Sequence, residues 1–463
     1  MMKTNLKKVI CMTLAAMTVF GASGCASWKL NSLYIPTYED NGQHLRTMGE
    51  LPPNMTNREQ VALYKAAGFN AVPYNEGYVS AAEVPTQGEN SAYLKGLRVC
   101  EEFGLDVLIR PHNEYISYKP TTEPNYFEKY FSDVDFRDYP AVKGFYFVDE
   151  PTLGQIEDVG TRYLPWFNEN YGGEGYEFVS NLYHLGHSVY PDRVGPSYDA
   201  YAEKFLTILE SAQSVNKHFS IDYYTLRYDL EKEENYMYET NLQCHADAAM
   251  RSKAHGVEFA AFVQAFGATS GFSYRLPTTF AEINWGVNNL LAFGVTTLKF
   301  FLYSEYKRDN LLGMLTDGEP NERYYWVQQA LKTLEKWDHV YLNYKWDHIY
   351  TNVGTGSKFA VNPAFEYVRD VQKPITDVTA IKSKYDLVLS EFTDGEGNKG
   401  CMLFNYDEPT LGRPNKVTLT FEKAEGAQYY QNGEMKTVLL EDGKFEVELA
   451  SGESVFVIPL YKK

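Results

Sequence analysis

The feature that most constrains the fold of this chain is a series of short apolar runs that alternate with helical patterns. Eight runs have the character of strands, at residues 32–36, 69–74, 106–110, 144–148, 178–183, 219–223, 258–263 and 297–303. They recur at intervals of roughly 35–40 residues, with helical patterns at 58–67, 93–103, 198–215, 240–255 and 279–293 between them. Such alternation indicates βα units and a parallel sheet, and eight units predict a (β/α)₈ barrel.

The joints between the predicted elements indicate which end of the barrel is functional. Four helix ends read AAGFN, EFGLD, AHGVE and AFGVT, and each places a glycine directly after the helix, where it can take the left-handed conformation. The connections after the strands are longer: HLGHSVYPDRVGPS, YTLRYDLEKEEN and QAFGATSGFSYRLPT follow the fifth, sixth and seventh runs. Short loops at one end and long loops at the other predict a site at the carboxyl ends of the strands.

The pattern changes after the helix predicted at 324–337, which closes the barrel. From about residue 345, short alternating runs (LVLSEF, GCMLFNY, KVTLTF, FEVELA and ESVFVIPL) are separated by the turns DGEGNKG, EDGK and SGES. They predict a small antiparallel β-sandwich. We therefore expect a signal segment at 1–24, a barrel at 25–343 and a sandwich at 344–463.

The N-terminus has the pattern of an export signal. Lys3, Lys7 and Lys8 precede a short apolar segment at 9–22, and Ala-Ser-Gly then leads into Cys25. This resembles a bacterial lipobox, which implies cleavage before Cys25, a lipid on its sulfur, and a protein exported to the cell envelope and held at the membrane by this anchor alone. Ordinary secretory cleavage nearby is the alternative.

Composition excludes some partners. The net charge of −18 is unsuited to nucleic acid, whose phosphates require basic side chains, and gives no basic patch for anionic lipid. The chain has 38 Tyr, 27 Phe and 6 Trp, enough both to fill a core and to line a groove for amphipathic ligands such as sugars. The spacing of Cys100, Cys244 and Cys401 is not that of a metal site, so we expect them to be buried as small apolar residues. The sequence leaves open whether two of them form a disulfide.

The fourth run ends in an acidic dyad. The segment GFYFVDEP places Asp149 and Glu150 directly after four apolar residues, and Pro151 follows. Neighbouring strand residues ordinarily point to opposite faces, but at a strand end fixed by proline both can lean toward the barrel mouth. The alternative is a pair of solvent-exposed acids that open a helix. The long buried run favours a functional dyad.

This segment resembles the fourth strand of clan A glycoside hydrolases, which are (β/α)₈ enzymes in which the strand ends in Asn-Glu-Pro. The resemblance implies a carbohydrate substrate, with Glu150 as general acid/base and Asp149 as a neighbour that binds the sugar, aspartate standing where asparagine is usual. It covers the barrel architecture and a three-residue motif.

The chain departs from that family at the seventh strand, which ends at Gln264 where the family has its nucleophilic glutamate. Glycoside cleavage generally needs a second carboxylate, about 5–5.5 Å from the first as a nucleophile or about 6.5–9.5 Å away as a base. Asp222, near the end of the sixth run and followed by Tyr223 and Tyr224, and Glu305, after the eighth run, are the candidates. Asp222 is favoured because its aromatic neighbours can shape a subsite.

Further polar side chains follow the predicted strands and suit a hydroxyl-rich ligand. The predicted substrate-binding residues are Asp149, Tyr74, Arg110, His112, Asn113, His184, Tyr224, Gln264 and Tyr303. His184 and His187 lie three residues apart without a matched acid, so we expect no metal there, and no cofactor motif is found.

The sequence as a whole indicates an exported, lipid-anchored glycoside hydrolase that acts on oligo- or polysaccharide. A carbohydrate-binding barrel lipoprotein that has lost hydrolysis is the main alternative, and Gln264 favours it. A barrel enzyme of another kind, such as a lyase or a deacetylase, is the third.

Overall fold

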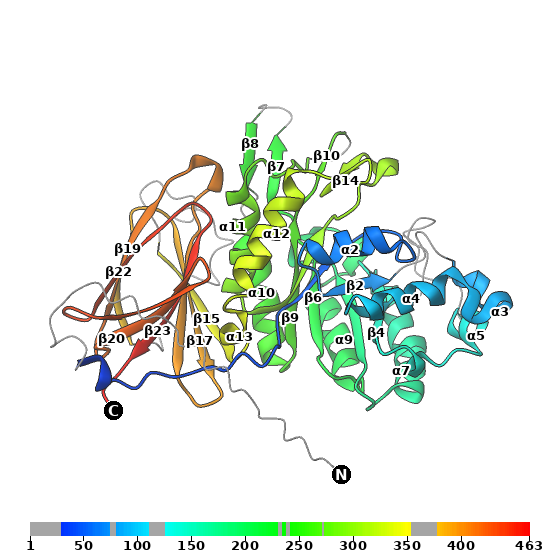
Figure 1. Ribbon diagram of the computed structural model, residues 1–463, viewed down its shortest axis with the longest axis horizontal. Coiled ribbons are helices and arrows are strands. Elements are labelled where there is room, and N and C mark those ends of the chain that lie inside the picture. The colour runs from blue at the N-terminus through cyan, green and yellow to red at the C-terminus, as the bar shows by residue number, and fades with distance from the viewer. Residues whose placement is uncertain are drawn as a thin grey trace, which may run out of the picture.

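The structure is a computed structural model that describes residues 29–74, 80–110, 126–229, 234–237, 241–270, 273–352 and 377–463. A barrel surrounded by helices lies beside a β-sandwich (Figure 1). The predicted signal segment and Cys25 fall outside the described residues. Within those residues, no helix is both long enough and apolar enough to cross a membrane.

Eight parallel strands close the barrel in the order β1-β11-β9-β6-β5-β4-β3-β2. Their bounds are β1 (Arg46–Gly49), β2 (Ala71–Tyr74), β3 (Asp106–Ile109), β4 (Val142–Asp149), β5 (Glu177–Leu182), β6 (His218–Ile221), β9 (Glu258–Gln264) and β11 (Val295–Phe301). The predicted (β/α)₈ barrel is thus confirmed, with seven of its strands at the predicted runs.

Helices cover the outside of the barrel. They include α2 (Arg58–Ala66), α4 (Ala92–Glu102), α5 (Tyr126–Phe131), α6 (Leu153–Asp158), α7 (Leu164–Asn170), α9 (Tyr198–Ser211), α10 (Asn241–Ala254), α11 (Phe280–Ala292) and α12 (Glu322–Leu334). Side-chain caps start several of them; Ser91, for example, accepts from the Leu94 amide at 3.3 Å. The four predicted helix-ending glycines all have positive φ, from 61° to 102°.

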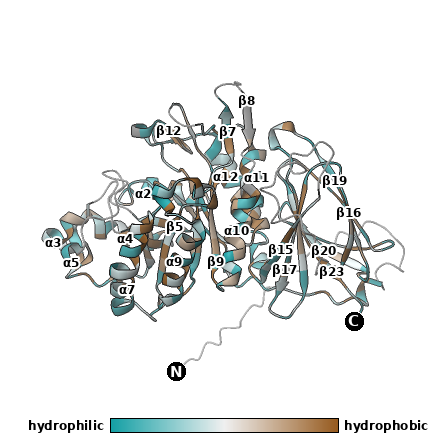
Figure 2. Cartoon of the chain, turned by 180° about the vertical axis from the view of Figure 1, so that it is seen from behind, coloured by the Kyte–Doolittle hydropathy of each residue, from teal (hydrophilic) through white to brown (hydrophobic). Residues whose placement is uncertain are grey.

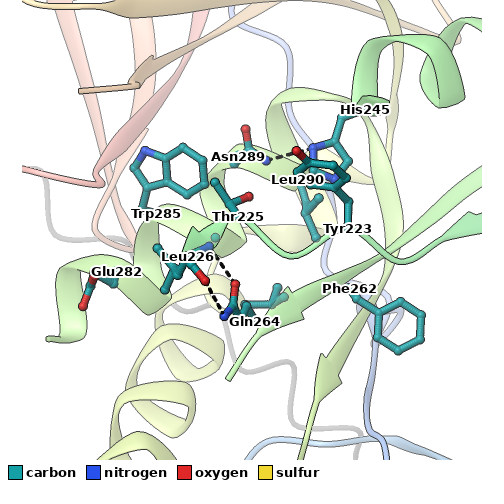
Figure 3. A pocket seen from close by; sticks show the side chains of 12 residues that line it. Tyr223, Thr225, Leu226, His245, Phe262, Gln264, Glu282, Trp285, Asn289 and Leu290 are labelled. Carbon is teal, nitrogen blue, oxygen red and sulfur yellow. Dashed lines mark hydrogen bonds between the residues drawn. The ribbon is translucent and has the colours of Figure 1, made fainter. Parts of the chain in front are cut away.

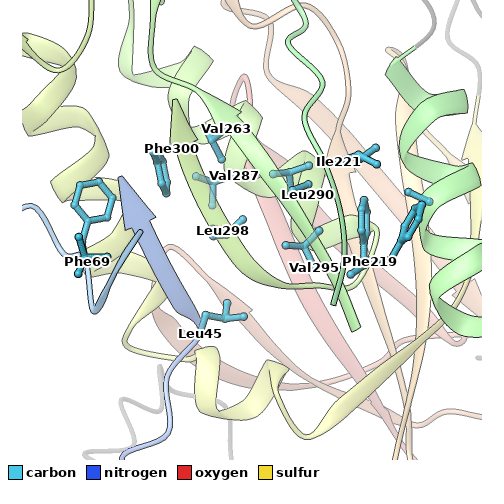
Figure 4. Packing of buried hydrophobic residues seen from close by; sticks show 14 of the residues in the cluster. Leu45, Phe69, Phe219, Ile221, Val263, Val287, Leu290, Val295, Leu298 and Phe300 are labelled. Carbon is cyan, nitrogen blue, oxygen red and sulfur yellow. The ribbon is translucent and has the colours of Figure 1, made fainter. Parts of the chain in front are cut away.

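Alternate residues of each strand face the helices and form the main core. Around β11 this layer includes Leu298 and Phe300, which pack with Val263 of β9 and with Val287 and Leu290 of α11 (Figure 4). Figure 2 shows the apolar colour concentrated in the strands and on the inner sides of the helices. The other face of the strands points into the barrel, where a small cluster includes Met48, Leu108 and Tyr146.

The first barrel strand is not the predicted one. Residues 32–36 lie along the sandwich, where the amide of Tyr34 donates to the carbonyl of Tyr461 at 2.9 Å, and this segment reaches the barrel only further on (Figure 1). The true strand, β1, reads RTMG and contains a single large apolar residue. It needs glycine because a Cβ on Gly49 would lie 2.9 Å from Phe69 and 3.0 Å from the Cβ of Tyr303. Because close packing requires glycine here, β1 lacks the alternating apolar pattern that predicts a strand from sequence.

The C-terminal region forms the predicted antiparallel sandwich. One sheet has the order β15-β17-β18-β23-β20-β21 and the other β16-β19-β22. The bounds are β15 (Tyr344–Asn352), β16 (Val378–Lys382), β17 (Leu387–Asp394), β18 (Lys399–Asn405), β19 (Asn415–Phe421), β20 (Gly426–Gln431), β21 (Glu434–Leu439), β22 (Lys444–Leu449) and β23 (Ser454–Leu460). Cys100, Cys244 and Cys401 are buried, as expected, and form no disulfide with one another.

A short hairpin is added where a loop was predicted after β6. Strands β7 (Leu226–Asp229) and β8 (Glu234–Met237) pair antiparallel and project above the barrel (Figure 1). They lie beyond the carboxyl end of β6, on the side predicted to be functional.

Candidate active site

The end of β4 is shaped so that two consecutive acids can serve the same site. Between Tyr146 and Asp149 the chain advances three positions while β5 advances two, from Val179 to Asn181, so β4 carries one extra residue, a β-bulge. Glu150 then has φ 44°, the left-handed region that a non-glycine residue occupies only at a cost. Its amide is held by the Asn181 carbonyl at 2.9 Å.

Glu150 and Asp222 form a hydrogen-bonded carboxyl pair, although they come from β4 and from the end of β6. Their bond raises the pKa of Glu150 and lowers that of Asp222, so Glu150 is the protonated donor. Burial, followed by the charges of Asp222 and Asp149, raises the pKa of Glu150 well above its ordinary value. Burial and the charge of Asp149 raise the pKa of Asp222 to about 7.

Asp149 connects this pair to charges inside the barrel. Its Oδ2 lies 3.0 Å from Nη2 of Arg110, whose Nη1 donates to Oε2 of Glu50 at 2.8 Å. Arg110 is 1% exposed, whereas the side chain of Asp149 is 38% exposed. The charged chain therefore runs from the barrel interior to a solvent-accessible rim, and the acid pair is not sealed off.

A second chain of hydrogen bonds reaches Asp149 from the opposite side of the barrel. Nζ of Lys299 donates to Oγ of Ser220 at 3.0 Å, and that hydroxyl donates to Oδ1 of Asn181 at 2.8 Å. Nδ2 of Asn181 donates to Oδ1 of Asp149 at 3.0 Å and also bonds Asp222. Burial lowers the pKa of Lys299 to about 8. One amide thus fixes both acids, and a buried lysine determines how that amide is oriented.

Sequence analysis missed Glu50, Asn181, Ser220 and Lys299. Glu50 follows the strand that was itself missed. Lys299 lies within an apolar run as an isolated charge, and the even spacing that places it in the barrel interior, two residues from Phe301, was the available signal. At the centre, the ring of Tyr146 lies 4.2 Å from the Arg110 guanidinium and 4.4 Å from Nζ of Lys299.

Two predicted binding residues, Tyr224 after β6 and His184 after β5, lie in aromatic surroundings. The ring of Tyr224 is buried edge-on against Phe266, 4.8 Å away, and the negative charge of Asp222 helps to raise its pKa. His184 packs against Tyr223 at 4.6 Å, and its Nδ1 accepts from the Gly186 amide at 3.0 Å. Burial lowers the pKa of His184 well below its usual value, so this histidine is neutral.

The structure corrects the placement of Tyr74 and Tyr303, which were predicted to bind substrate. Both are buried on the helix-facing side of the barrel. The hydroxyl of Tyr74 donates to the Tyr93 carbonyl at 2.7 Å, and the ring of Tyr303 lies edge-on to Tyr64 at 4.9 Å. Strand parity is the reason for Tyr74, which shares the outward face with Val72 two positions before it. Tyr303 lies beyond the end of β11, where the alternation no longer holds, and it packs in the same core as Phe300.

The side-chain amide of Gln264 is hydrogen-bonded to the surrounding backbone. Its Oε1 accepts from the Leu226 amide at 2.8 Å, and its Nε2 donates to the Leu226 carbonyl at 3.0 Å (Figure 3). Nε2 also donates to the Arg275 carbonyl at 3.0 Å. Gln264 lines a small pocket with Tyr223, Thr225, His245 and Trp285, among others, and neither acid of the pair lines that pocket. Gln264 thus holds the start of β7 against the end of β9, a role different from the predicted contact with substrate.

The remaining predicted residues are placed as follows. Glu305 accepts from the Asp317 amide at 3.0 Å and lies 3.2 Å from Nζ of Lys307, so it is a paired loop acid and is not part of the acid cluster. His112 and Asn113 lie outside the described residues. Within the part of the chain that the structure describes, no three His, Cys, Asp or Glu side chains are arranged to hold a metal ion.

Comparison with known proteins identifies the fold. No family model matches the sequence, and no curated protein matches it. Among solved structures, the chain is similar to a glycoside hydrolase family 5 protein from Bacteroides vulgatus, with a TM-score of 0.53, 10% identity, and coverage of 93% of this chain and 94% of that one.

Two further solved structures are also glycoside hydrolases. A GH27 β-L-arabinopyranosidase from Geobacillus stearothermophilus has a TM-score of 0.47, 12% identity, and coverage of 91% of this chain and 98% of that one. A family 30 subfamily 8 xylanase from Clostridium acetobutylicum has a TM-score of 0.44, 11% identity, and coverage of 90% and 96%. At such low identity, the likeness to the family 5 structure is one of fold alone, a barrel joined to a sandwich.

Proposed function

We propose that this protein is a glycoside hydrolase that acts on oligo- or polysaccharide. The observation that carries the proposal is the pair of Glu150 and Asp222 at the carboxyl ends of the barrel strands, where burial raises the pKa of both acids and their contact favours the proton on Glu150. Glycoside cleavage requires such a pair of carboxyl groups in opposite protonation states.

Each acid has a role that follows from its protonation. Glu150 protonates the departing glycosidic oxygen, because burial and the charges of Asp222 and Asp149 raise its pKa well above its ordinary value and so favour its protonated form. Asp222, the ionised partner, attacks or stabilises the sugar at the anomeric carbon. One of its oxygens, Oδ1, is buried and has no hydrogen-bond donor among the described residues, so it is not weakened as a nucleophile by a second bond.

The closeness of the pair favours retention of anomeric configuration. Two carboxyl groups in hydrogen-bond contact must move apart in either mechanism, to about 5–5.5 Å for retention or about 6.5–9.5 Å for inversion, and retention needs the smaller movement. Sugar binding breaks the contact, and the glycosidic oxygen replaces Asp222 as the acceptor of the Glu150 proton. Proton NMR of the first-formed anomer distinguishes the two outcomes.

The test is a screen of the purified protein against polysaccharides and aryl glycosides, with Glu150→Gln, Asp222→Asn and Glu305→Gln as variants. Loss of the general acid should lower kcat by about 10²–10⁴-fold on unactivated substrates. Loss of Asp222 should do at least as much. Glu305→Gln is the matched control and should retain activity, because Glu305 is engaged by Lys307. Full activity in Glu150→Gln would refute the assignment.

A second function, carbohydrate binding without hydrolysis, is favoured by one observation. The seventh barrel strand ends in Gln264, whose amide is committed to the backbone, where clan A hydrolases have a nucleophilic glutamate. Binding of a glycan by calorimetry, with no reducing ends released by the wild-type protein, would establish this alternative.

We further propose that the protein is exported and lipid-anchored through Cys25. The support is the basic and apolar pattern before it in the sequence. Metabolic labelling with palmitate should mark the wild-type protein and leave Cys25→Ser unlabelled; an unlabelled wild-type protein in the culture medium would contradict the anchor.

A further inference from the structure

Most arginines that the structure describes have a carboxylate partner; Arg193 and Arg323 have none among the described residues, and of these two Arg323 donates to the Gly313 carbonyl at 3.0 Å. Nine of the described arginines have a carboxylate oxygen within 4 Å: Arg46, Arg58, Arg98, Arg110, Arg137, Arg162, Arg251, Arg275 and Arg413. Arg193 has no such partner among the described residues, although acids outnumber bases 61 to 43 in the chain. An uncompensated guanidinium in so acidic a protein needs an explanation.

The surroundings of Arg193 fix its position without neutralising it. Its guanidinium carbon lies 5.3 Å from the ring of Tyr183 and 5.2 Å from the ring of Tyr190. Stacking on aromatic rings holds an arginine in place and leaves the N–H donors at its edge available. Arg193 lies in α8 (Pro191–Val194), within the long connection that follows β5.

Arg193 is also close to the candidate catalytic pair. Its guanidinium lies over the ring of Tyr183, the residue directly after β5, and its positive charge partly offsets the rise that burial causes in the pKa of Tyr183 and of Glu150. The segment before it is open to solvent: Tyr190 is 49% exposed and Val189 is 71% exposed. A donor-bearing cation and an exposed aromatic face therefore adjoin the acids on the solvent side.

We propose that Arg193 and Tyr190 form a subsite for a negatively charged sugar residue, so that the substrate is an acidic saccharide. The guanidinium binds the anionic group through paired N–H donors, and the exposed ring of Tyr190 stacks on the sugar. Arginine suits this role because its planar fork matches a carboxylate. The proposal rests on the acid pair being the site of glycan binding, and it deepens the proposed function.

The overall charge of the protein makes such a cation necessary for an acidic ligand. At a net charge of −18 the protein repels polyanions at long range. Affinity for an anionic glycan then has to come from a local positive group, and Arg193 is the arginine at the rim that no carboxylate neutralises. A neutral glycan would not require it.

The experiment measures binding separately from hydrolysis. Isothermal titration uses Glu150→Gln as the background and three matched ligands: a uronic-acid oligosaccharide, its carboxyl-reduced neutral counterpart and a sulfated oligosaccharide. With Arg193 present, an acidic ligand should bind about ten- to a hundredfold more tightly than the neutral one, since a charge-assisted hydrogen bond is lost in the neutral ligand. Arg193→Gln should bring this ratio toward one, and Tyr190→Ala should weaken binding of both ligands.

Arg162→Gln is the matched control, because Arg162 pairs with Asp158 on the outer helices and should leave the ratio unchanged. The ligand that shows the Arg193-dependent preference identifies carboxylate or sulfate as the anionic group. A ratio that survives Arg193→Gln, or the absence of binding to either acidic ligand, overturns the inference. Arg193-dependent binding without hydrolysis by the wild-type protein would refute the enzyme proposal while supporting the subsite.

Discussion

The charge of Asp149 should determine the pH at which the proposed enzyme becomes active. Activity requires Asp222 ionised, and its pKa is about 7 because burial and the charge of Asp149 raise it. The acid limb of kcat/KM in the wild type should therefore have its midpoint near pH 7. Asp149→Asn removes one negative charge and keeps a side chain of the same size, so ionisation of Asp222 becomes easier and the limb moves to lower pH.

The size of the shift follows from the geometry. Asp149 and Asp222 both accept from the amide of Asn181, so their oxygens lie roughly 5 Å apart, given about 3 Å from each acceptor to the shared nitrogen. Two unit charges at that distance interact by about 3 kcal/mol at an effective dielectric of 20, which corresponds to about two pH units. The side chain of Asp149 is 38% exposed, and screening reduces the expected displacement to about one pH unit.

The assay is a pH series of kcat/KM between pH 4 and 10 on a substrate found by the screen. Carboxyl carbon NMR of Asp222 gives an independent titration that does not depend on turnover. The asparagine in Asp149→Asn can still accept a hydrogen bond from Asn181. A lower kcat with an unchanged midpoint of the acid limb would therefore show that Asp149 contributes by binding the sugar and not through its charge. An unmoved midpoint in both measurements, in a variant with unchanged circular dichroism and unfolding midpoint, would refute the electrostatic coupling.

Three further predictions concern stability. Gly49→Ala should lower the free energy of unfolding by about 1–3 kcal/mol, measured in urea, because its Cβ would overlap Phe69. Lys299→Met should lower it by about 3–5 kcal/mol, since it removes one of the two cations, Arg110 and Lys299, that face the buried acids; an unchanged value would show that the lysine is not charged. Folding raises the pKa of Asp222 from 3.8 to about 7, so its contribution to stability is full below pH 4 and is lost as the pH rises through 7. The urea midpoint should therefore fall from pH 5 to pH 8, and fall less in Asp222→Asn.

The fold could be predicted because the barrel repeats one unit. Seven strands are marked by apolar runs, and four junctions by glycines that end helices. The exception, β1, shows the limit of the method: where neighbouring side chains approach closely, glycine and threonine replace the apolar residues that mark a strand. The segment at 32–36 has the apolar pattern of a strand because Leu33 is buried, but Leu33 is buried against the sandwich and not in the barrel.

The candidate site could be predicted less completely. The sequence pointed to Glu150, Asp149, Asp222 and Arg110, because polar residues at strand ends in a barrel converge on one rim. Tyr74 and Tyr303 also lie at or just beyond strand ends, but their side chains face the helices. Predicting this requires knowing which face each residue of a strand occupies, and a bulge or an uncertain strand end changes that assignment. Asn181 and Ser220 are ordinary polar residues in sequence, and their importance appears only when three strands bring them between Lys299 and the acids.

The charge of the barrel centre explains why a proton is held at the acid pair. Two cations face four acids there, namely Arg110 and Lys299 against Glu50, Asp149, Glu150 and Asp222. With Glu150 protonated, Glu50, Asp149 and Asp222 carry three negative charges against two positive ones, a net charge of −1 that includes Asp222. Glycoside cleavage develops positive charge at the anomeric carbon, so a site with one residual negative charge stabilises the transition state more than the neutral sugar. Removing either cation would raise the negative charge, favour a second proton on the pair, and so inactivate Asp222; Lys299 is thus expected to keep one member of the pair ionised.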